Sequence, residues 1–67
     1  MKRYKIAIVW RGDRGARAAA TPDNNRYHRI FAELQAIGID AEPAVYAEEL
    51  IDEVRAQLLK VDGVLVC

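Results

Sequence analysis

The chain has 67 residues, of which 52% are hydrophobic and 30% charged, and its formal net charge at pH 7 is zero. This length allows one small domain, and the composition is that of a globular protein rather than a disordered one. No apolar run approaches the about 20 residues that a membrane helix needs, so no membrane partner is expected. The balanced charge and the absence of a nucleic-acid-binding motif likewise predict no nucleic-acid partner.

Two further features bear on location and partners. The apolar run at 6–10 is too short for the core of a signal peptide, and the single cysteine, Cys67, cannot form an internal disulfide. We therefore expect a cytoplasmic protein. Residues 1–29 carry a net charge of +6 and residues 30–67 a net charge of −6. Either these are two solvated faces that attract each other, or the basic half meets an anionic ligand.

The first half of the chain predicts a strand, a loop and a helix. Residues 4–10 are nearly all apolar, which is typical of a parallel strand that is covered on both faces. Residues 11–20 follow as a loop rich in Gly, Arg and Ala. The sequence Thr-Pro-Asp at 21–23 predicts a helix start, and Gly38 is placed to end that helix. The expected apolar stripe of the helix is Tyr27, Ile30, Phe31, Leu34 and Ile37.

The second half predicts a strand, a helix and a last strand. Residues 40–46 form the weaker strand, and Pro43 argues for a position at the edge of the sheet, because proline cannot donate a ladder hydrogen bond. A helix is expected over 47–61, followed by a turn at 62–63. The apolar run 64–67 is expected to be a strand that is buried on both faces. A protein rarely ends in such a strand, so we expect the chain to continue in a larger parent protein.

These elements predict an α/β fold with a three-stranded parallel sheet in β-α-β-α-β topology. The edge signal at Pro43 favours the strand order 2-1-3 with one helix on each face, which is half of a Rossmann-like domain. Residues 1–67 would then be a single partial domain. In such sheets a ligand binds at the carboxyl ends of the strands that flank the switch point, here strands one and three. The loop at 11–20 lies at that point.

Five residues of this loop form the candidate substrate-binding site, namely Arg11, Gly12, Asp13, Arg14 and Arg17. Guanidinium groups match carboxylate or phosphate in a two-pronged geometry, and glycines let the backbone approach a ligand. Asn24-Asn25-Arg26 adds polar groups near the same cleft. The alternative is a solvated loop in which Asp13 neutralises an arginine. The loop matches neither the dinucleotide fingerprint nor the phosphate-binding P-loop, so a nucleotide binder is the least favoured reading.

The residues that could carry chemistry do not combine into a catalytic group. His28 stands alone, Cys67 has no base near it in sequence, and the acids at 48–53 are typical of a helix N-terminus. We therefore expect no catalytic residue and no metal ligand here. The isolated chain is expected to be inactive, and whether the parent is an enzyme stays open.

Several segments resemble the start of a family of poorly characterised bacterial proteins with an ATP-grasp-like core. The most distinctive are Val-Trp-Arg-Gly-Asp-Arg at 9–14 and Val-Asp-Gly-Val-Leu-Val at 61–66, supported by residues 18–22 and 40–46. The resemblance implies a pre-ATP-grasp-like N-terminal domain of an ATP-dependent carboxylate–amine ligase. It also implies that ATP and magnesium are held by later domains, with no cofactor in this chain.

Two functions of different classes are thus expected. The first is a substrate-docking domain that binds an anionic small molecule at the loop after strand one, next to the C-terminal domains of the parent. The alternative is a small α/β interaction module that associates through its exposed strand edge, for example as a homodimer.

Overall fold

The computed structural model describes residues 3–67 of the chain. The elements in chain order are β1 (Lys5–Arg11), α1 (Arg14–Ala19), α2 (His28–Ala36), β2 (Asp40–Tyr46), a 3-10 turn (Glu48–Leu50), α3 (Ile51–Leu58) and β3 (Gly63–Val66). The three strands are parallel and lie in the order β2-β1-β3. The α/β class, the strand order and the edge position of Pro43 are confirmed, and the fold is a Rossmann-like half-domain.

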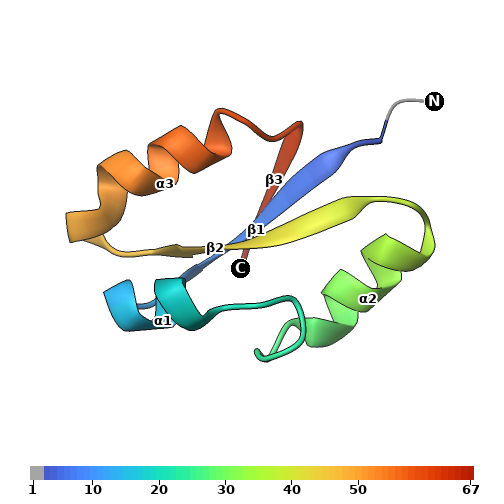
Figure 1. Ribbon diagram of the computed structural model, residues 1–67, viewed down its shortest axis with the longest axis horizontal. Coiled ribbons are helices and arrows are strands. Elements are labelled where there is room, and N and C mark those ends of the chain that lie inside the picture. The colour runs from blue at the N-terminus through green and yellow to red at the C-terminus, as the bar shows by residue number, and fades with distance from the viewer. Residues whose placement is uncertain (1–2) are drawn as a thin grey trace.

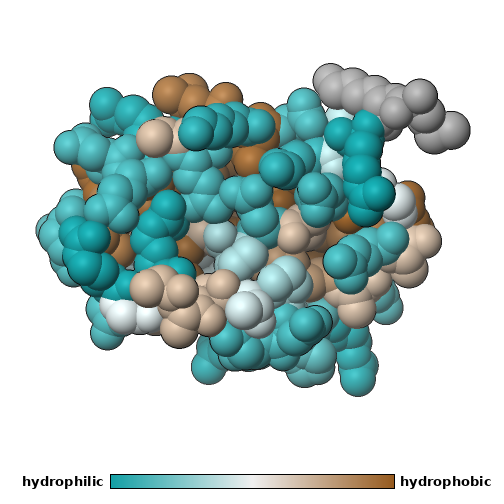
Figure 2. Space-filling model, viewed as in Figure 1, coloured by the Kyte–Doolittle hydropathy of each residue, from teal (hydrophilic) through white to brown (hydrophobic). Residues whose placement is uncertain are grey.

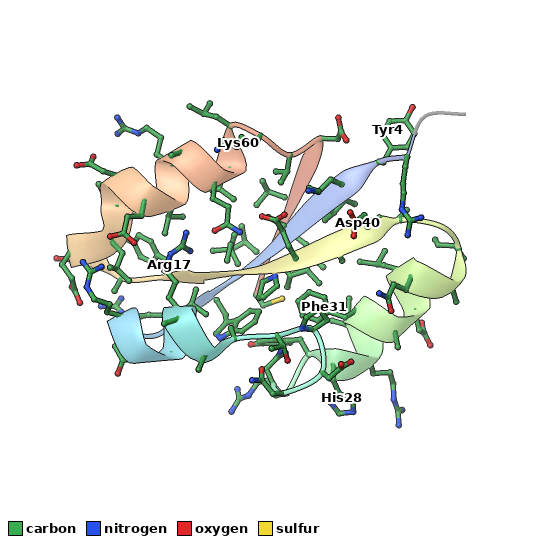
Figure 3. All side chains as sticks on the ribbon, in the orientation of Figure 1. Tyr4, Arg17, His28, Phe31, Asp40 and Lys60 are labelled. Carbon is green, nitrogen blue, oxygen red and sulfur yellow. The ribbon has the colours of Figure 1, made fainter. Side chains whose placement is uncertain are left out.

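The helices cover both sides of the sheet. Figure 1 shows α3 on one side and α1 and α2 on the other. On the α2 side, Ile8, Phe31 and Ala41 form a buried cluster. Phe31 is 1% exposed and points from α2 toward the strands (Figure 3). On the α3 side a second cluster consists of Ala47, Leu50 and Val54, with Tyr46 and Leu58 packed against it.

The predicted loop at 11–20 contains a helix, α1, that the sequence analysis missed. Asp13 caps it, because its Oδ1 accepts a hydrogen bond of 2.7 Å from the backbone N–H of Ala16. The residues that follow include several alanines, which favour a helix once the first turn is capped. The glycines and arginines of this segment suggested a loop, but they do not prevent a short helix.

The predicted helix start at 21–23 is wrong, because α2 begins at His28. Side chains between the two helices bond to the backbone instead of leaving it free for a helix. Asn24 donates to the carbonyl of Ala19, and Asn25 donates to the carbonyl of Thr21. Such local side-chain bonds compete with helix formation. The end of α2 is as predicted, since Gly38 has a φ of 85° in the left-handed region.

The last two predicted elements need smaller corrections. The helix expected over 47–61 is a 3-10 turn followed by α3, which ends at Leu58. The strand β3 is not buried on both faces. Val64, Leu65 and Val66 are 47%, 42% and 74% exposed, because β3 is an edge strand whose outer side pairs with no described element. Within residues 3–67, no helix has the length and apolar character to cross a membrane.

Candidate functional site

Gly12 directly follows β1 and lies beside the end of the neighbouring strand β2. Its backbone N–H donates to the carbonyl of Tyr46 over 2.8 Å. A Cβ atom at this position would lie 2.6 Å from Cγ1 of Val45 and 3.3 Å from Cβ of Ala16. The missing side chain therefore lets α1 begin close against β2. Together with the helix cap made by Asp13, this gives two of the five predicted site residues a structural role.

Arg14 and Arg17 lie on the face of α1 that looks toward α3. Nη1 of Arg14 donates to Oε1 of Glu53 over 2.8 Å, and Nε of Arg17 lies 3.6 Å from Oε2 of the same carboxylate. Arg17 also donates from Nη1 to the carbonyl of Val45 over 3.3 Å, and its side chain is 21% exposed. Figure 3 shows Arg17 directed from α1 toward β2 and α3. The structure thus places both arginines beside β2, away from β3.

The two arginines act on the ionisation of Glu53. The hydrogen bond from Arg14 and its positive charge lower the pKa of the Glu53 carboxyl below its ordinary value of 4.5, and Arg17 adds to this effect. Desolvation of the carboxyl raises the pKa and opposes these effects, more strongly than Arg17 lowers it. Since the carboxylate is held in its charged form, it offsets part of the charge that these arginines would offer to an anionic ligand.

A hollow of about 600 Å³ runs along this side of β2, between α1 and α3. Its charged lining is mixed, with Arg14, Arg17 and Lys60 against Glu42 and Glu53. Figure 2 shows the side of the molecule on which β2 lies in front, and this side is mostly hydrophilic. Apolar residues gather at its upper rim, by α3. The mixture of signs makes this hollow a poor place for an anion.

A second polar hollow lies at the switch point that the topology predicts. It has a volume of about 510 Å³, and its lining residues are Trp10, Arg11, Asn25, Arg26, Tyr27 and Cys67. Arg11 ends β1, and Cys67 directly follows β3 with its N–H bonded to the carbonyl of Val9 at 2.9 Å. The hollow therefore sits at the carboxyl ends of β1 and β3.

Arg11 and Arg26 bring the positive charge to this hollow. Neither guanidinium has an ion pair or a side-chain hydrogen bond with any residue in the described range 3–67. Of the five predicted site residues, only Arg11 lies here, and Arg26 joins it from the segment before α2. The sequence analysis noted Arg26 as a nearby polar residue without including it in the site. Its position follows from the turn at Asn24 and Asn25, which brings this segment back toward the end of β1.

The side chains that line this hollow are suited to binding an anionic ligand. Two guanidiniums that have no carboxylate partner in the described part of the chain line this hollow, and guanidinium groups bind carboxylate and phosphate. The ring centroids of Trp10 and Tyr27 lie 5.3 Å apart, so the wall beside the arginines is aromatic. Among residues 3–67, no group of three or more His, Cys, Asp and Glu could hold a metal ion. His28 bonds locally through Nδ1 to the carbonyl of Asn25 at 3.0 Å, and points away from the sheet (Figure 3).

Comparisons with known proteins do not assign this arrangement to a family. A scan against protein-family models, a search of curated proteins and a search of solved structures each find no match. The class that the fold defines is therefore a parallel α/β half-domain with a basic hollow at its switch point, and its function is argued from these residues.

Proposed function

We propose that this chain is a ligand-docking domain that binds an anionic group, a carboxylate or a phosphate, between Arg11 and Arg26. The observation that carries the proposal is the pair of guanidiniums without a described carboxylate partner at the carboxyl ends of β1 and β3. This is the place where open parallel sheets bind their ligands. Arg14 and Arg17 are excluded from the site because Glu53 occupies them.

The same proposal has a second, wider part. On the resemblance of the segments at 9–14 and 61–66, the bound group is the carboxylate of a substrate that an ATP-grasp-like ligase of the bacterial cytoplasm activates with ATP and magnesium. This part is supported by the resemblance alone. The residues described here would contribute substrate binding and no catalytic step.

Anion binding is tested by nuclear magnetic resonance titration of the chain with inorganic phosphate and with acetate. We expect saturable shifts at the backbone amides of Arg11, Arg26 and Tyr27. Replacing either arginine by glutamine should weaken binding by about tenfold to a hundredfold, because a hydrogen bond to a charged group contributes about 1.5–3 kcal/mol. The variants are Arg11→Gln and Arg26→Gln.

Arg29→Gln provides the matched control, since it removes the same charge from an exposed position of α2 that does not line the hollow. The control should retain the affinity of the wild type at equal ionic strength. If Arg11→Gln binds phosphate as well as Arg29→Gln does, the proposed site is wrong. The ligase part is tested separately, by assaying the parent protein for ATP cleavage that depends on a carboxylate, and it fails if the parent binds no ATP.

A further inference from the structure

The two edges of the sheet differ in how their outward-facing backbone groups are used. At the β2 edge, hydrogen bonds made by Asp40 N–H and by the carbonyl of Tyr46 join this strand to β1 or its flanks. The backbone N–H and C=O groups point alternately to the two sides of a strand. Those of Ala41, Pro43 and Val45 therefore point outward, away from β1.

Side chains block this β2 edge. Pro43 has no N–H to offer, and its carbonyl accepts a hydrogen bond of 2.9 Å from Nε2 of Gln57. The carbonyl of Val45 accepts from Nη1 of Arg17 over 3.3 Å. A further strand would have to displace both side chains and would still lack one donor. Covered and proline-containing edges of this kind prevent pairing with other chains.

The outer edge of β3 pairs with no residue in the described range 3–67. The N–H of Cys67 donates to the carbonyl of Val9, so the alternate residues Val64 and Val66 direct their backbone groups outward. The side chains here are apolar on both faces of the sheet, and Val66 is 74% exposed. On the α3 side, Val66 is the cross-strand neighbour of Val9, which lines an apolar groove of about 340 Å³. An unpaired edge with apolar faces is a template for another strand.

We propose that this edge is the interface for a second copy of the chain, which adds its own β3 antiparallel to the first. A two-fold axis perpendicular to the sheet leaves corresponding faces of the two sheets on the same side of the dimer. Residues that stand opposite each other across the axis must therefore have their side chains on the same face. The register that uses only strand residues places Leu65 opposite Leu65 of the second copy. Val64 then stands opposite Val66 of the second copy, and these two residues carry the outward backbone groups that form the new hydrogen bonds.

Two observations favour a second copy over a different chain. The register is self-complementary, with apolar residues opposite apolar residues and no like charges at the axis. Because side chains block the β2 edge, two copies that pair through their sheet edges pair β3 to β3, which gives a closed dimer rather than a fibre.

The expected dimer is weak. A four-residue strand edge buries less than the about 1,200–2,000 Å² of a standard stable interface, so we expect dissociation between micromolar and millimolar concentrations. Sedimentation of the chain over this range should show a reversible monomer–dimer equilibrium. Val66→Lys should weaken it by about tenfold, because symmetry removes the cross-strand pair twice. Ile37→Lys is the matched control, since Ile37 is 73% exposed at the end of α2 and should leave the equilibrium unchanged.

Cysteine cross-linking tests the register. In a Cys67→Ser background, Leu65→Cys should form a disulfide between copies, because opposite residues of a non-hydrogen-bonded pair lie about 4.5 Å apart at Cα. In Val66→Cys the two new cysteines do not stand opposite each other, and their Cα atoms lie about 9 Å apart. This variant should therefore cross-link much more slowly. A chain that stays monomeric at millimolar concentration overturns the proposal. So does equal cross-linking of the two variants, or a monomer that pairs only with an unrelated strand peptide.

Discussion

Arg14 on α1 and Glu53 on α3 form a hydrogen-bonded ion pair in which Nη1 lies 2.8 Å from Oε1, although the two residues are 39 positions apart in the chain. Arg17 approaches the other oxygen of the same carboxylate at 3.6 Å. One carboxylate therefore holds α1 against α3 across the blocked edge of β2. This contact also decides which arginines remain for a ligand, since it occupies two and leaves Arg11 at the switch point.

The contact should depend on pH. The folded-state pKa of Glu53 lies below its ordinary value of 4.5, so its contribution to stability is fully present above that value and is lost as the pH falls below it through the folded pKa. We expect the amide protons of α1 to exchange faster at about pH 3 than at about pH 6, beyond the intrinsic change in exchange rate. Hydrogen exchange followed residue by residue measures this.

Glu53→Gln provides the comparison, because it keeps the shape of the side chain and removes its charge. In this variant the excess exchange of α1 should already be present at neutral pH and should show little further change on acidification. Glu49→Gln, which changes an exposed acid of the 3-10 turn with no described ion pair, should behave as the wild type does. Protection of α1 that is equal in all three proteins would contradict the role given to Glu53.

Gly12 and Gly15 offer a paired test of close packing. Gly12→Ala places a Cβ atom 2.6 Å from Cγ1 of Val45, and this overpacking should cost about 1–3 kcal/mol of the free energy of unfolding. A Cβ atom at position 15 meets only Oδ1 of Asp13 at an ordinary 3.5 Å. Gly15→Ala, within α1, should therefore stabilise by about 0.5–1 kcal/mol. Urea denaturation of both variants checks the two signs, and a Gly12→Ala protein as stable as the wild type would refute the packing argument.

The sequence predicts the strands and their order because these features depend on short local stretches of sequence. The apolar run of β1 and the proline of β2 each carry their own signal, and right-handed crossovers leave few arrangements. The placement of Arg11 follows from the topology, since it ends β1 beside the switch point. For the same reason the sequence predicts a ligand-binding cleft at this end of the sheet.

Which arginines contact Glu53 and which line the hollow could not be predicted in the same way. It depends on the cap by Asp13, which turns a loop into a helix and sets Arg14 and Arg17 on one face, three residues apart. It also depends on a tertiary contact with Glu53, which no local pattern reveals. Arg26 reaches the hollow only because the asparagines before it hold a turn instead of a helix.

Phe31 should be the most sensitive core position of α2. It is 1% exposed and packs with Ile8 and Trp10, whose ring lies 6.3 Å from its own. Phe31→Ala should cost about 3–5 kcal/mol, which is comparable to the about 3–10 kcal/mol expected for a whole domain of this length. We expect the variant to be largely unfolded by circular dichroism. Ile37→Ala, at the C-cap of the same helix and 73% exposed, should unfold as the wild type does, and similar losses in both variants would argue against this core.

Asp13 separates a structural role from a binding role at the predicted site. Its Oδ1 accepts from the N–H of Ala16, so Asp13→Ala should cost about 1 kcal/mol in urea denaturation, whereas Asp13→Asn keeps an acceptor of equal capping strength and should cost much less. Phosphate affinity at Arg11 and Arg26 should change by less than about twofold in Asp13→Asn, because the carboxylate bonds to α1 and does not line the hollow. If Asn destabilises as much as Ala does, the cap is not the reason for this residue. If Asn instead strongly alters phosphate binding, Asp13 belongs to the ligand site after all.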